Sequence, residues 1–488
     1  MTAKKVLFML SVFVFFLFPF QAFTQDIAPE TSSVTKHSIA IGGKTINYTA
    51  TAGTILIRDE KEKPQAHIFY IAYTKDGVTD KTRRPILFSF NGGPGSSSVW
   101  MHMGFLGPRR VLYDDEGFGL QPPYRLEDNV HSILDQTDLV FIDPVATGFS
   151  RMVPGEDEHK FHGVDEDIQS VGEFIRLYVT RHQRWGSPKF IIGESYGTTR
   201  AAGLTAHLQN RHRMYINGTI LVSTMMLGVK SGDDLAYPLI LPHYTATAWY
   251  HKQLPPDLQS KALRDVLDEA EEFALNDYTL ALIRGNDLTE NEKNTVADKL
   301  ARYTGLSTEY IKRSNLRVSR TRFRKELLRH EDLTVGRLDS RYKGKDKDSV
   351  GEVNEFDPAM AAWNGPFTGA VNRYFREELK YETDLSYDIF GNVHPWKGMS
   401  EAHVGEALRR AMTQNPFLKV LVLEGYYDGA CDYFSAEYTF SHLDLRGDWK
   451  DRLRFDYYEC GHMMYLRKAD LAKAKKDLEN FIVSAVPK

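Results

Sequence analysis

The sequence predicts an α/β fold in which helices cover both faces of a mostly parallel central sheet. Short, almost wholly apolar runs recur along the chain, separated by stretches with helical spacing. Such runs are typical of strands buried on both faces, which parallel sheets require. The runs are Pro85–Phe90, Leu139–Ile142, Lys189–Ile192, Ile220–Val222 and Val420–Leu423. Before them, Ser38–Thr74 has alternating and β-branched residues that indicate antiparallel strands.

Four segments are expected: a signal peptide (1–24), two parts of the core (25–226 and 364–488), and between them a helical cap insertion (227–363). In the insertion, apolar residues over Leu263–Ala274 follow helical spacing. We expect it to lie over the active face of the sheet. Its stretch Arg313–Lys347 is rich in Lys and Arg, which is more typical of a solvated helix face and loop than of an anionic ligand site.

The N-terminus has the pattern of an export signal. Two lysines precede the apolar run Val6–Phe20, and small residues in Gln21–Thr24 suit cleavage. Because a bilayer span needs about 20 apolar residues, cleavage is favoured over an uncleaved membrane anchor. The mature protein is expected to start near Gln25, to be periplasmic or secreted, and not to remain inserted in a membrane.

Charge and cysteine usage exclude several classes of function. The formal net charge of −4 is too close to neutral to indicate a nucleic-acid or membrane-surface partner. The two cysteines, Cys431 and Cys460, do not have zinc-site spacing. Export would permit their oxidation.

Gly193–Gly197 has the Gly-x-Ser-x-Gly pattern of a nucleophile elbow. An apolar strand precedes it, and a helix is expected over Thr198–Arg211, so Ser195 would lie in a strand-to-helix turn too tight for side chains on either side. The helix N-terminus would also present free N–H groups to developing negative charge. This context predicts the α/β-hydrolase fold, with Ser195 as nucleophile.

An acyl-transfer serine needs N–H donors for the oxyanion. One is expected from Tyr196, directly after the nucleophile, and the other from a loop after an earlier strand. The glycine-rich loop Asn91–Ser98 follows the strand Pro85–Phe90 and suits that place. Glycine lets the backbone approach a substrate closely.

In this fold the acid and then the histidine follow the serine along the chain. His462 follows the aromatic run Phe455–Tyr458 and precedes a final helix, whereas His442 falls inside a helix expected over Ser435–Leu443. His462 is therefore the predicted base.

The acid should end the preceding strand. Asp428 follows Val420–Leu423 at that distance and is favoured over Asp432 and Glu424. An aspartate there would orient the imidazole and stabilise its positive charge.

These residues resemble the serine carboxypeptidase family (peptidase family S10). Four motifs match in order: Asn91–Ser98; Phe141–Pro144 through Gly148–Ser150; Gly193–Tyr196; and Asp428–Cys431 with Gly461–Met463. The resemblance implies a triad of Ser195, Asp428 and His462, with oxyanion N–H groups from Gly93 and Tyr196. It also implies removal of C-terminal residues from peptide substrates without metal or cofactor.

The sequence departs from the family pattern near the proposed site. Ser89 and Ser96 stand for Trp and Cys, and Thr199–Arg200 replaces His-Tyr. Asn91 and Gly92, which belong to the family's subsite for the substrate's terminal carboxylate, are retained.

Two glutamates complete that subsite in the family. One matches Glu194, but Phe105 stands in place of the other. Either apolar surroundings raise the pKa of Glu194 by desolvation, or a cation, Arg109 or Arg200, keeps it ionised. Both predict intact chemistry with a weaker preference for a free C-terminus over its amide than two glutamates would give. A third alternative is that Asn91 and the Gly92 N–H suffice, with Phe105 packing against the substrate side chain.

Cys431 follows the proposed acid and Cys460 precedes the proposed base. If the triad forms, a disulfide and two buried thiols are both geometrically plausible. The favoured function is an exported serine carboxypeptidase that forms an acyl-enzyme on Ser195. An esterase or acyltransferase for small molecules would use the same triad, whereas the intact Ser-Asp-His set disfavours an inactive binding protein.

Overall fold

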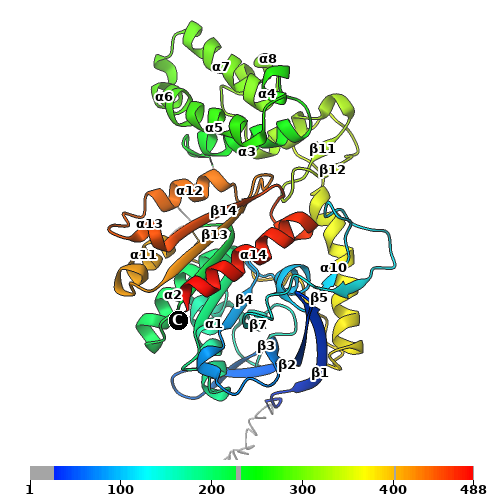
Figure 1. The fold of residues 1–488 in the computed structure, drawn as a ribbon. Helices are drawn as coiled ribbons and strands as arrows, with labels where there is room; N and C mark the ends of the chain where they lie inside the picture. Colours follow the sequence, from blue (N-terminus) through cyan, green and yellow to red (C-terminus); the bar gives the residue numbers. More distant parts are fainter. Residues whose placement is uncertain (1–26, 227–231, 400–402, 487–488) are drawn as a thin grey trace, which may run out of the picture.

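A computed structural model describes residues 27–226, 232–399 and 403–486 (Figure 1). The predicted signal peptide, residues 1–24, lies outside the described residues. Within the described ranges, no helix is both long and apolar enough to cross a membrane.

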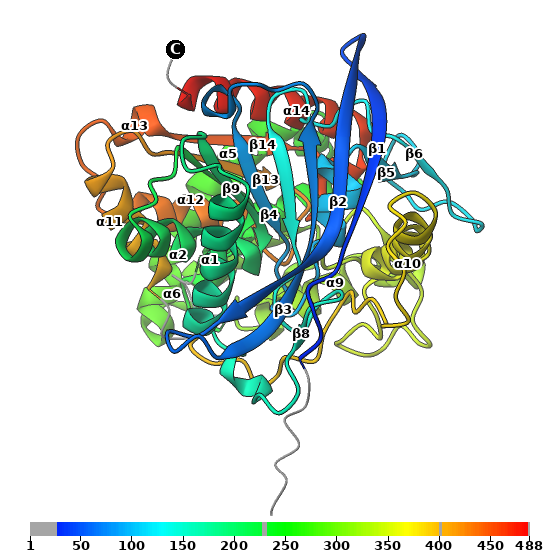
Figure 2. The same ribbon diagram turned by 90° about the horizontal axis from the view of Figure 1, so that it is seen from below.

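A ten-stranded sheet forms the centre of the protein, in the order β1-β2-β3-β7-β4-β9-β10-β13-β14, with β8 paired to β3. Its antiparallel edge, visible in Figure 2, comprises β1 (Ser32–Ile41), β2 (Lys44–Arg58), β3 (Pro64–Lys75) and β8 (Arg151–Met152). The parallel part comprises β7 (Asp138–Ile142), β4 (Ile86–Phe90), β9 (Lys189–Ser195), β10 (Gly218–Thr224), β13 (Lys419–Gly425) and β14 (Leu453–Tyr458). The predicted fold class is confirmed.

Helices cover both faces of the sheet, as strands apolar on both sides require. One face packs against α1 (Val164–Arg181), α2 (Tyr196–His212) and α11 (Val404–Gln414). The other packs against α10 (Pro358–Glu377), α14 (Lys468–Ala485) and the π-helical turn η2 (Met101–Leu106). Successive side chains of β9 point to opposite faces of the sheet. Ile191 packs in the first layer, and Phe190 and Ile192 pack in the second.

A further helical layer with its own core lies on one side of the sheet, beyond α12 (Tyr433–Ser441) (Figure 1). We call this layer the cap. It comprises α3 (Ala236–Tyr250), α4 (Pro256–Gln259), α5 (Leu263–Phe273), η4 (Ala274–Tyr278), α6 (Thr279–Arg284), α7 (Glu290–Thr304), α8 (Thr308–Arg313) and α9 (Arg320–Glu326). Tyr427 and Tyr433, which follow β13, pack into the cap's core. Residue 363, the expected end of the insertion, lies within α10. Trp363 packs in the core on the sheet face that α10 and α14 cover.

Short elements complete the fold. The strands β5 (Arg109–Val111) and β6 (Leu126–Asp128) form one antiparallel pair, and β11 (Thr334–Val335) and β12 (Lys343–Gly344) form another. A one-turn helix, α13 (Trp449–Arg452), precedes β14.

The loop after β4 is tied to the loop after β7 through Asp143. One carboxylate oxygen of Asp143 accepts hydrogen bonds from the backbone N–H of Ser98, at 2.8 Å, and from its hydroxyl, at 2.7 Å. Gly148 lies against the other oxygen with a φ of +52°, and a Cβ atom there would lie 1.7 Å from that oxygen. The contact therefore requires glycine for both its backbone angle and its lack of a side chain.

Replacing Gly148 with alanine should displace Asp143 and loosen the loop after β4. A positive φ alone costs a non-glycine residue about 1–2 kcal/mol, and the overlap adds to that. Gly155→Ala is the matched control, because Gly155 has a φ of +83° and open space around it. We expect Gly148→Ala to lower the urea midpoint more than Gly155→Ala does; equal losses would contradict the assigned contact.

The possible disulfide between Cys431 and Cys460 is not formed, so on this point the structure favours the two-thiol alternative. Both are free and buried. The sulfur of Cys460 accepts a hydrogen bond from the Arg341 guanidinium at 2.8 Å. Cys431 lies beside His462 instead, so the thiols have different partners although their loops are neighbours.

We expect two thiols in the denatured protein without reductant, and the same count after reduction. The native protein should react slowly with a thiol reagent, because burial raises the pKa of both thiols and the thiolate is the reactive form. Ellman titration with and without denaturant measures both quantities. A count of zero in the unreduced, denatured protein would contradict the structure.

Candidate active site

Ser195 lies at the junction of β9 and α2, in a sharp strand-to-helix turn. Its φ of 60° and ψ of −128° are unusual for a residue with a side chain. A Cβ atom on Gly193 would lie 2.1 Å from the carbonyl oxygen of Gly197, so the turn leaves no room for a larger residue. This is the geometry expected from the glycine spacing, and it leaves the serine only partly buried at the sheet edge.

Asp428 and His462 meet at that edge from the loops after β13 and β14. His462 Nδ1 lies 2.6 Å from one Asp428 carboxylate oxygen, and the other oxygen accepts backbone hydrogen bonds from Ala430 and Cys431 at 2.8 and 3.0 Å. Burial lowers the pKa of His462, but the charge and hydrogen bond of Asp428 outweigh it, so the net shift is upward. The pair is thus built to stabilise an imidazolium.

The other residues considered for acid and base point elsewhere. Asp432 forms an ion pair with Arg320 at 2.7 Å. One Glu424 oxygen accepts the backbone N–H of Thr224 at 3.0 Å. His442 is exposed at the end of α12.

Most of the predicted site residues line one cavity of about 210 Å³, whereas Asp428 and Tyr196 lie behind its lining. Its lining includes Ser195 and His462 together with Asn91, Gly92, Gly93 and Glu194. Arg337 and Leu338, from the chain between the cap and α10, also line it. The carbonyl oxygen of Leu338 accepts the backbone N–H of His462 at 2.7 Å, so this segment helps to hold the histidine loop.

Glu194 is 2% exposed and lies at the floor of this cavity. Its carboxylate oxygens accept one hydrogen bond each, from the Asn91 amide at 2.9 Å and from the Tyr465 hydroxyl at 2.5 Å. Burial raises the pKa of Glu194 to about 7, despite the opposing effects of His462 and of both donors. The group can therefore change charge near neutral pH.

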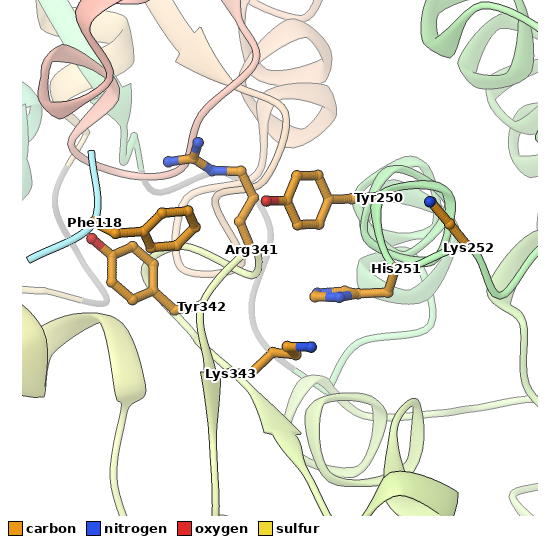
Figure 3. A pocket seen from close by; sticks show the side chains of 7 residues that line it. All are labelled: Phe118, Tyr250, His251, Lys252, Arg341, Tyr342 and Lys343. Atoms are coloured by element: carbon orange, nitrogen blue, oxygen red, sulfur yellow. The ribbon is translucent and has the colours of Figure 1, made fainter. Parts of the chain in front are cut away.

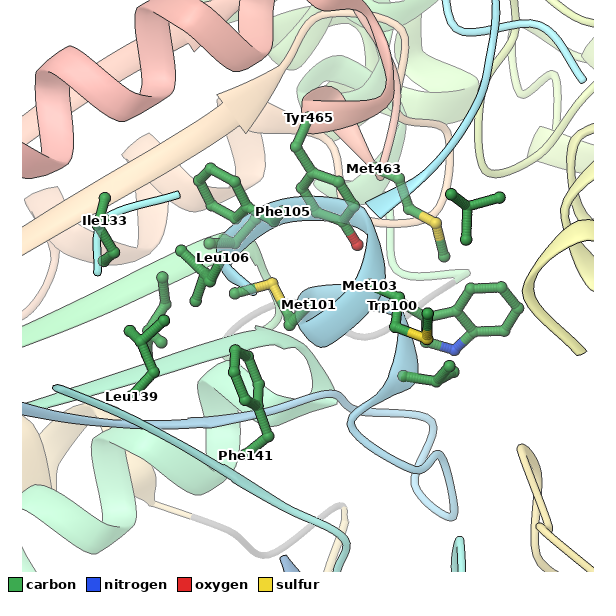
Figure 4. Packing of buried hydrophobic residues seen from close by; sticks show 14 of the residues in the cluster. Trp100, Met101, Met103, Phe105, Leu106, Ile133, Leu139, Phe141, Met463 and Tyr465 are labelled. Carbon is green, nitrogen blue, oxygen red and sulfur yellow. The ribbon is translucent and has the colours of Figure 1, made fainter. Parts of the chain in front are cut away.

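Phe105 does not face the cavity. It is buried in η2, and its ring stacks on that of Tyr465, with centroids 5.0 Å apart and planes 7° apart (Figure 4). Of the two arginines considered as partners for Glu194, Arg109 pairs with Asp128 and Glu378, and Arg200 pairs with Asp167. The structure therefore supports the desolvation alternative for Glu194.

Sequence reasoning missed three neighbours of the site. The hydroxyl of Tyr465 reaches Glu194 across 271 positions, which no local pattern encodes. Arg337 lies in the basic stretch that composition alone assigned to a solvated surface. For Cys431 the sequence left a disulfide and a buried thiol open, but a place beside His462 was not predicted, although its position three residues after Asp428 could have indicated it.

Comparisons with known proteins agree with this architecture. The family described as serine carboxypeptidase matches residues 43–461. Pheromone-processing carboxypeptidase KEX1 of Saccharomyces cerevisiae is 32% identical over 157 residues, which cover 30% of this chain and 20% of KEX1. Serine carboxypeptidase-like 36 of Arabidopsis thaliana is 26% identical over 189 residues, covering 37% of this chain and 36% of the plant protein.

Among solved structures, the crystal structure of Kex1(delta)p, a prohormone-processing carboxypeptidase from Saccharomyces cerevisiae, has the same fold. It superposes with a TM-score of 0.54 and 15% sequence identity, and the match covers 89% of this chain and 91% of that one. The family match begins just before β2 and ends at residue 461, directly before His462, so its range spans the cap and most of the core. The chain belongs to the serine carboxypeptidase family.

Proposed function

We propose that this protein is an exported serine carboxypeptidase that hydrolyses C-terminal peptide bonds through an acyl-enzyme on Ser195. The main support is that the cavity beside Ser195 and the Asp428–His462 pair also contains a buried, titratable carboxyl group, Glu194. Family membership supports the same reaction. Export is proposed from the signal pattern of residues 1–24.

In the proposed reaction, Ser195 Oγ attacks the carbonyl carbon of the last peptide bond while His462 accepts the hydroxyl proton. Asp428 orients the imidazole, and the N–H groups of Gly93 and Tyr196 stabilise the oxyanion. The C–N bond then breaks, and His462 returns the proton to the leaving amine. Water, deprotonated by His462, finally releases the acyl group.

Asn91, Gly92 and Glu194 are proposed to bind the terminal carboxylate of the substrate. In its protonated form Glu194 can donate a hydrogen bond to that carboxylate, while the ionised form repels it. Tyr465 acts through Glu194, because its hydroxyl is wholly buried and stabilises the ionised form. It is therefore a positioning residue.

A fluorophosphonate probe should label Ser195 alone, because only an activated serine attacks such reagents. Ser195→Ala and Asp428→Asn should each lower kcat by about 10³-fold or more. Mass spectrometry of a digested mixed-peptide library should show loss of single residues from C-termini. Peptidase activity retained in Ser195→Ala would rule out the proposed nucleophile.

Asp432→Asn is the control for the acid, because it removes a buried carboxylate from the same loop that does not contact His462. It should retain far more activity than Asp428→Asn, provided that circular dichroism shows both variants folded. Turnover of simple esters without any peptide cleavage would instead favour an esterase or acyltransferase that uses the same triad.

The preference for a free C-terminus should fall as pH rises through about 7, because Glu194 ionises there. Tyr465→Phe removes a donor to the ionised carboxylate, which raises the pKa of Glu194 and moves the fall to higher pH. The measurement is the ratio of kcat/KM for matched free-acid and amide peptides from pH 5 to 9. In this ratio the titration of His462 cancels.

Tyr458→Phe is the matched control, since its buried hydroxyl also donates to a carboxylate, Asp477, at 2.9 Å but in another part of the core. It should leave the pH dependence of the ratio unchanged. A ratio that rises above pH 7, or an inflection that moves downward in Tyr465→Phe, would contradict the role assigned to Glu194.

A further inference from the structure

A second cavity, of about 340 Å³, lies between the cap and the loop that carries Asp428. Tyr244 of α3, Arg320 and Arg324 of α9, and Arg337 contribute to its lining. Arg337 and Ala430 line both this cavity and the catalytic one, so the two cavities adjoin. We call it the arginine pocket.

Arg320 is bound to the loop that carries Asp428. Its guanidinium pairs with Asp432 at 2.7 Å and donates to the carbonyl oxygens of Gly429 and Ala430 at 3.1 and 3.0 Å. These contacts join the start of α9 to the Asp428 loop. Arg324, four residues later, lies on the same face of the helix.

Arg324 is only 7% exposed, yet its guanidinium has no carboxylate partner among the described residues. Its Nε atom is buried without any hydrogen-bond partner. Burial lowers the pKa of Arg324, and the charges of Arg337 and Arg320 lower it further. A buried charge left unpaired is costly, so this guanidinium is suited to an anion that enters the pocket.

Arg341 illustrates the contrast within the same chain. It is also buried and lies beside a different cavity (Figure 3), but its guanidinium meets Asp339 at 2.6 Å. A structural arginine is thus supplied with a carboxylate of its own. Arg324 is not.

Among the described residues that line the arginine pocket, three are arginines and none is a carboxylate. Arg320, Arg324 and Arg337 face two carboxylates, Asp432 and Asp357. Asp432 is engaged by Arg320, and Asp357 accepts the backbone N–H groups of Arg337 and Leu338 at 3.0 and 3.1 Å. Arg337 is exposed and borders the catalytic cavity, so its charge is available to a ligand in either space.

We propose that the arginine pocket binds an acidic side chain of the peptide substrate, through Arg324 and Arg337. The proposal rests on the peptidase function proposed above and adds a substrate class to it. The terminal carboxylate already has a proposed subsite at Asn91, Gly92 and Glu194, so the second carboxylate is assigned to an Asp or Glu side chain. Guanidinium–carboxylate hydrogen bonds are among the strongest in proteins.

The test uses acetylated tetrapeptides with a free C-terminus, in which Glu or Gln stands at each position in turn. At one position at least, kcat/KM should be about tenfold higher for Glu than for Gln. Arg324→Met should remove that preference while keeping the rate on the Gln peptide within about twofold. Arg322→Met is the matched control, because Arg322 lies on the same helix but pairs with Glu352 outside the pocket.

Equal rates for Glu and Gln at every position would overturn the proposal. A second contradicting result is that Arg324→Met loses the preference for free acid over amide but keeps the preference for Glu over Gln. The pocket would then bind the terminal carboxylate of the substrate. If Arg324→Met does not fold, Arg337→Met, at an exposed site, must reduce the preference. Calorimetric binding of the Glu and Gln peptides to Ser195→Ala separates this question from catalysis, and equal affinities there would also overturn it.

Discussion

The cavity beside Ser195 depends on a buried ion pair between Arg200 of α2 and Asp167 of α1, whose side chains are 1% and 3% exposed. The Arg200 guanidinium donates to Asp167 at 2.7 Å and to the carbonyl oxygen of Asn91 at 2.6 Å, and the Tyr196 hydroxyl donates to the same carboxylate at 3.0 Å. A buried charge is costly unless it is paired and hydrogen-bonded, and here both conditions are met. The network therefore holds α1, α2 and the glycine-rich loop in one relative position.

That position also determines the chemistry of Glu194. It places the Asn91 amide on one carboxylate oxygen, while the apolar packing of Phe105 directs the Tyr465 hydroxyl to the other. Two donors favour the ionised form, yet burial prevails and the pKa rises to about 7. This rise in the pKa of Glu194 means that its surroundings disfavour the ionised form, relative to water, by on the order of 3 kcal/mol.

Much of the fold, and the sheet edge where the proposed triad lies, could be predicted from local sequence patterns. Apolar runs identify buried strands, and the carboxyl ends of parallel strands meet at one edge, so residues that follow β9, β13 and β14 must lie near one another. This is why Ser195, Asp428 and His462 could be named before the structure and are found at that edge, the last two in direct contact. The sharp turn at Ser195 could be predicted from its flanking glycines, because such a turn depends only on adjacent residues.

Only the tertiary structure decided which distant side chains meet. Whether Arg200 faces Glu194 or Asp167, and whether Cys431 meets Cys460 or His462, depends on the direction of each side chain after the helices have packed. The basic stretch Arg313–Lys347 shows the same limit, because its composition indicated a solvated surface. In the folded protein Arg324 of this stretch is buried in the arginine pocket, without a carboxylate partner among the described residues. Sequence thus determined which segments form strands and carry the proposed catalytic residues. The pairing of buried charges arises from contacts between segments far apart in the chain, and no local pattern records those contacts.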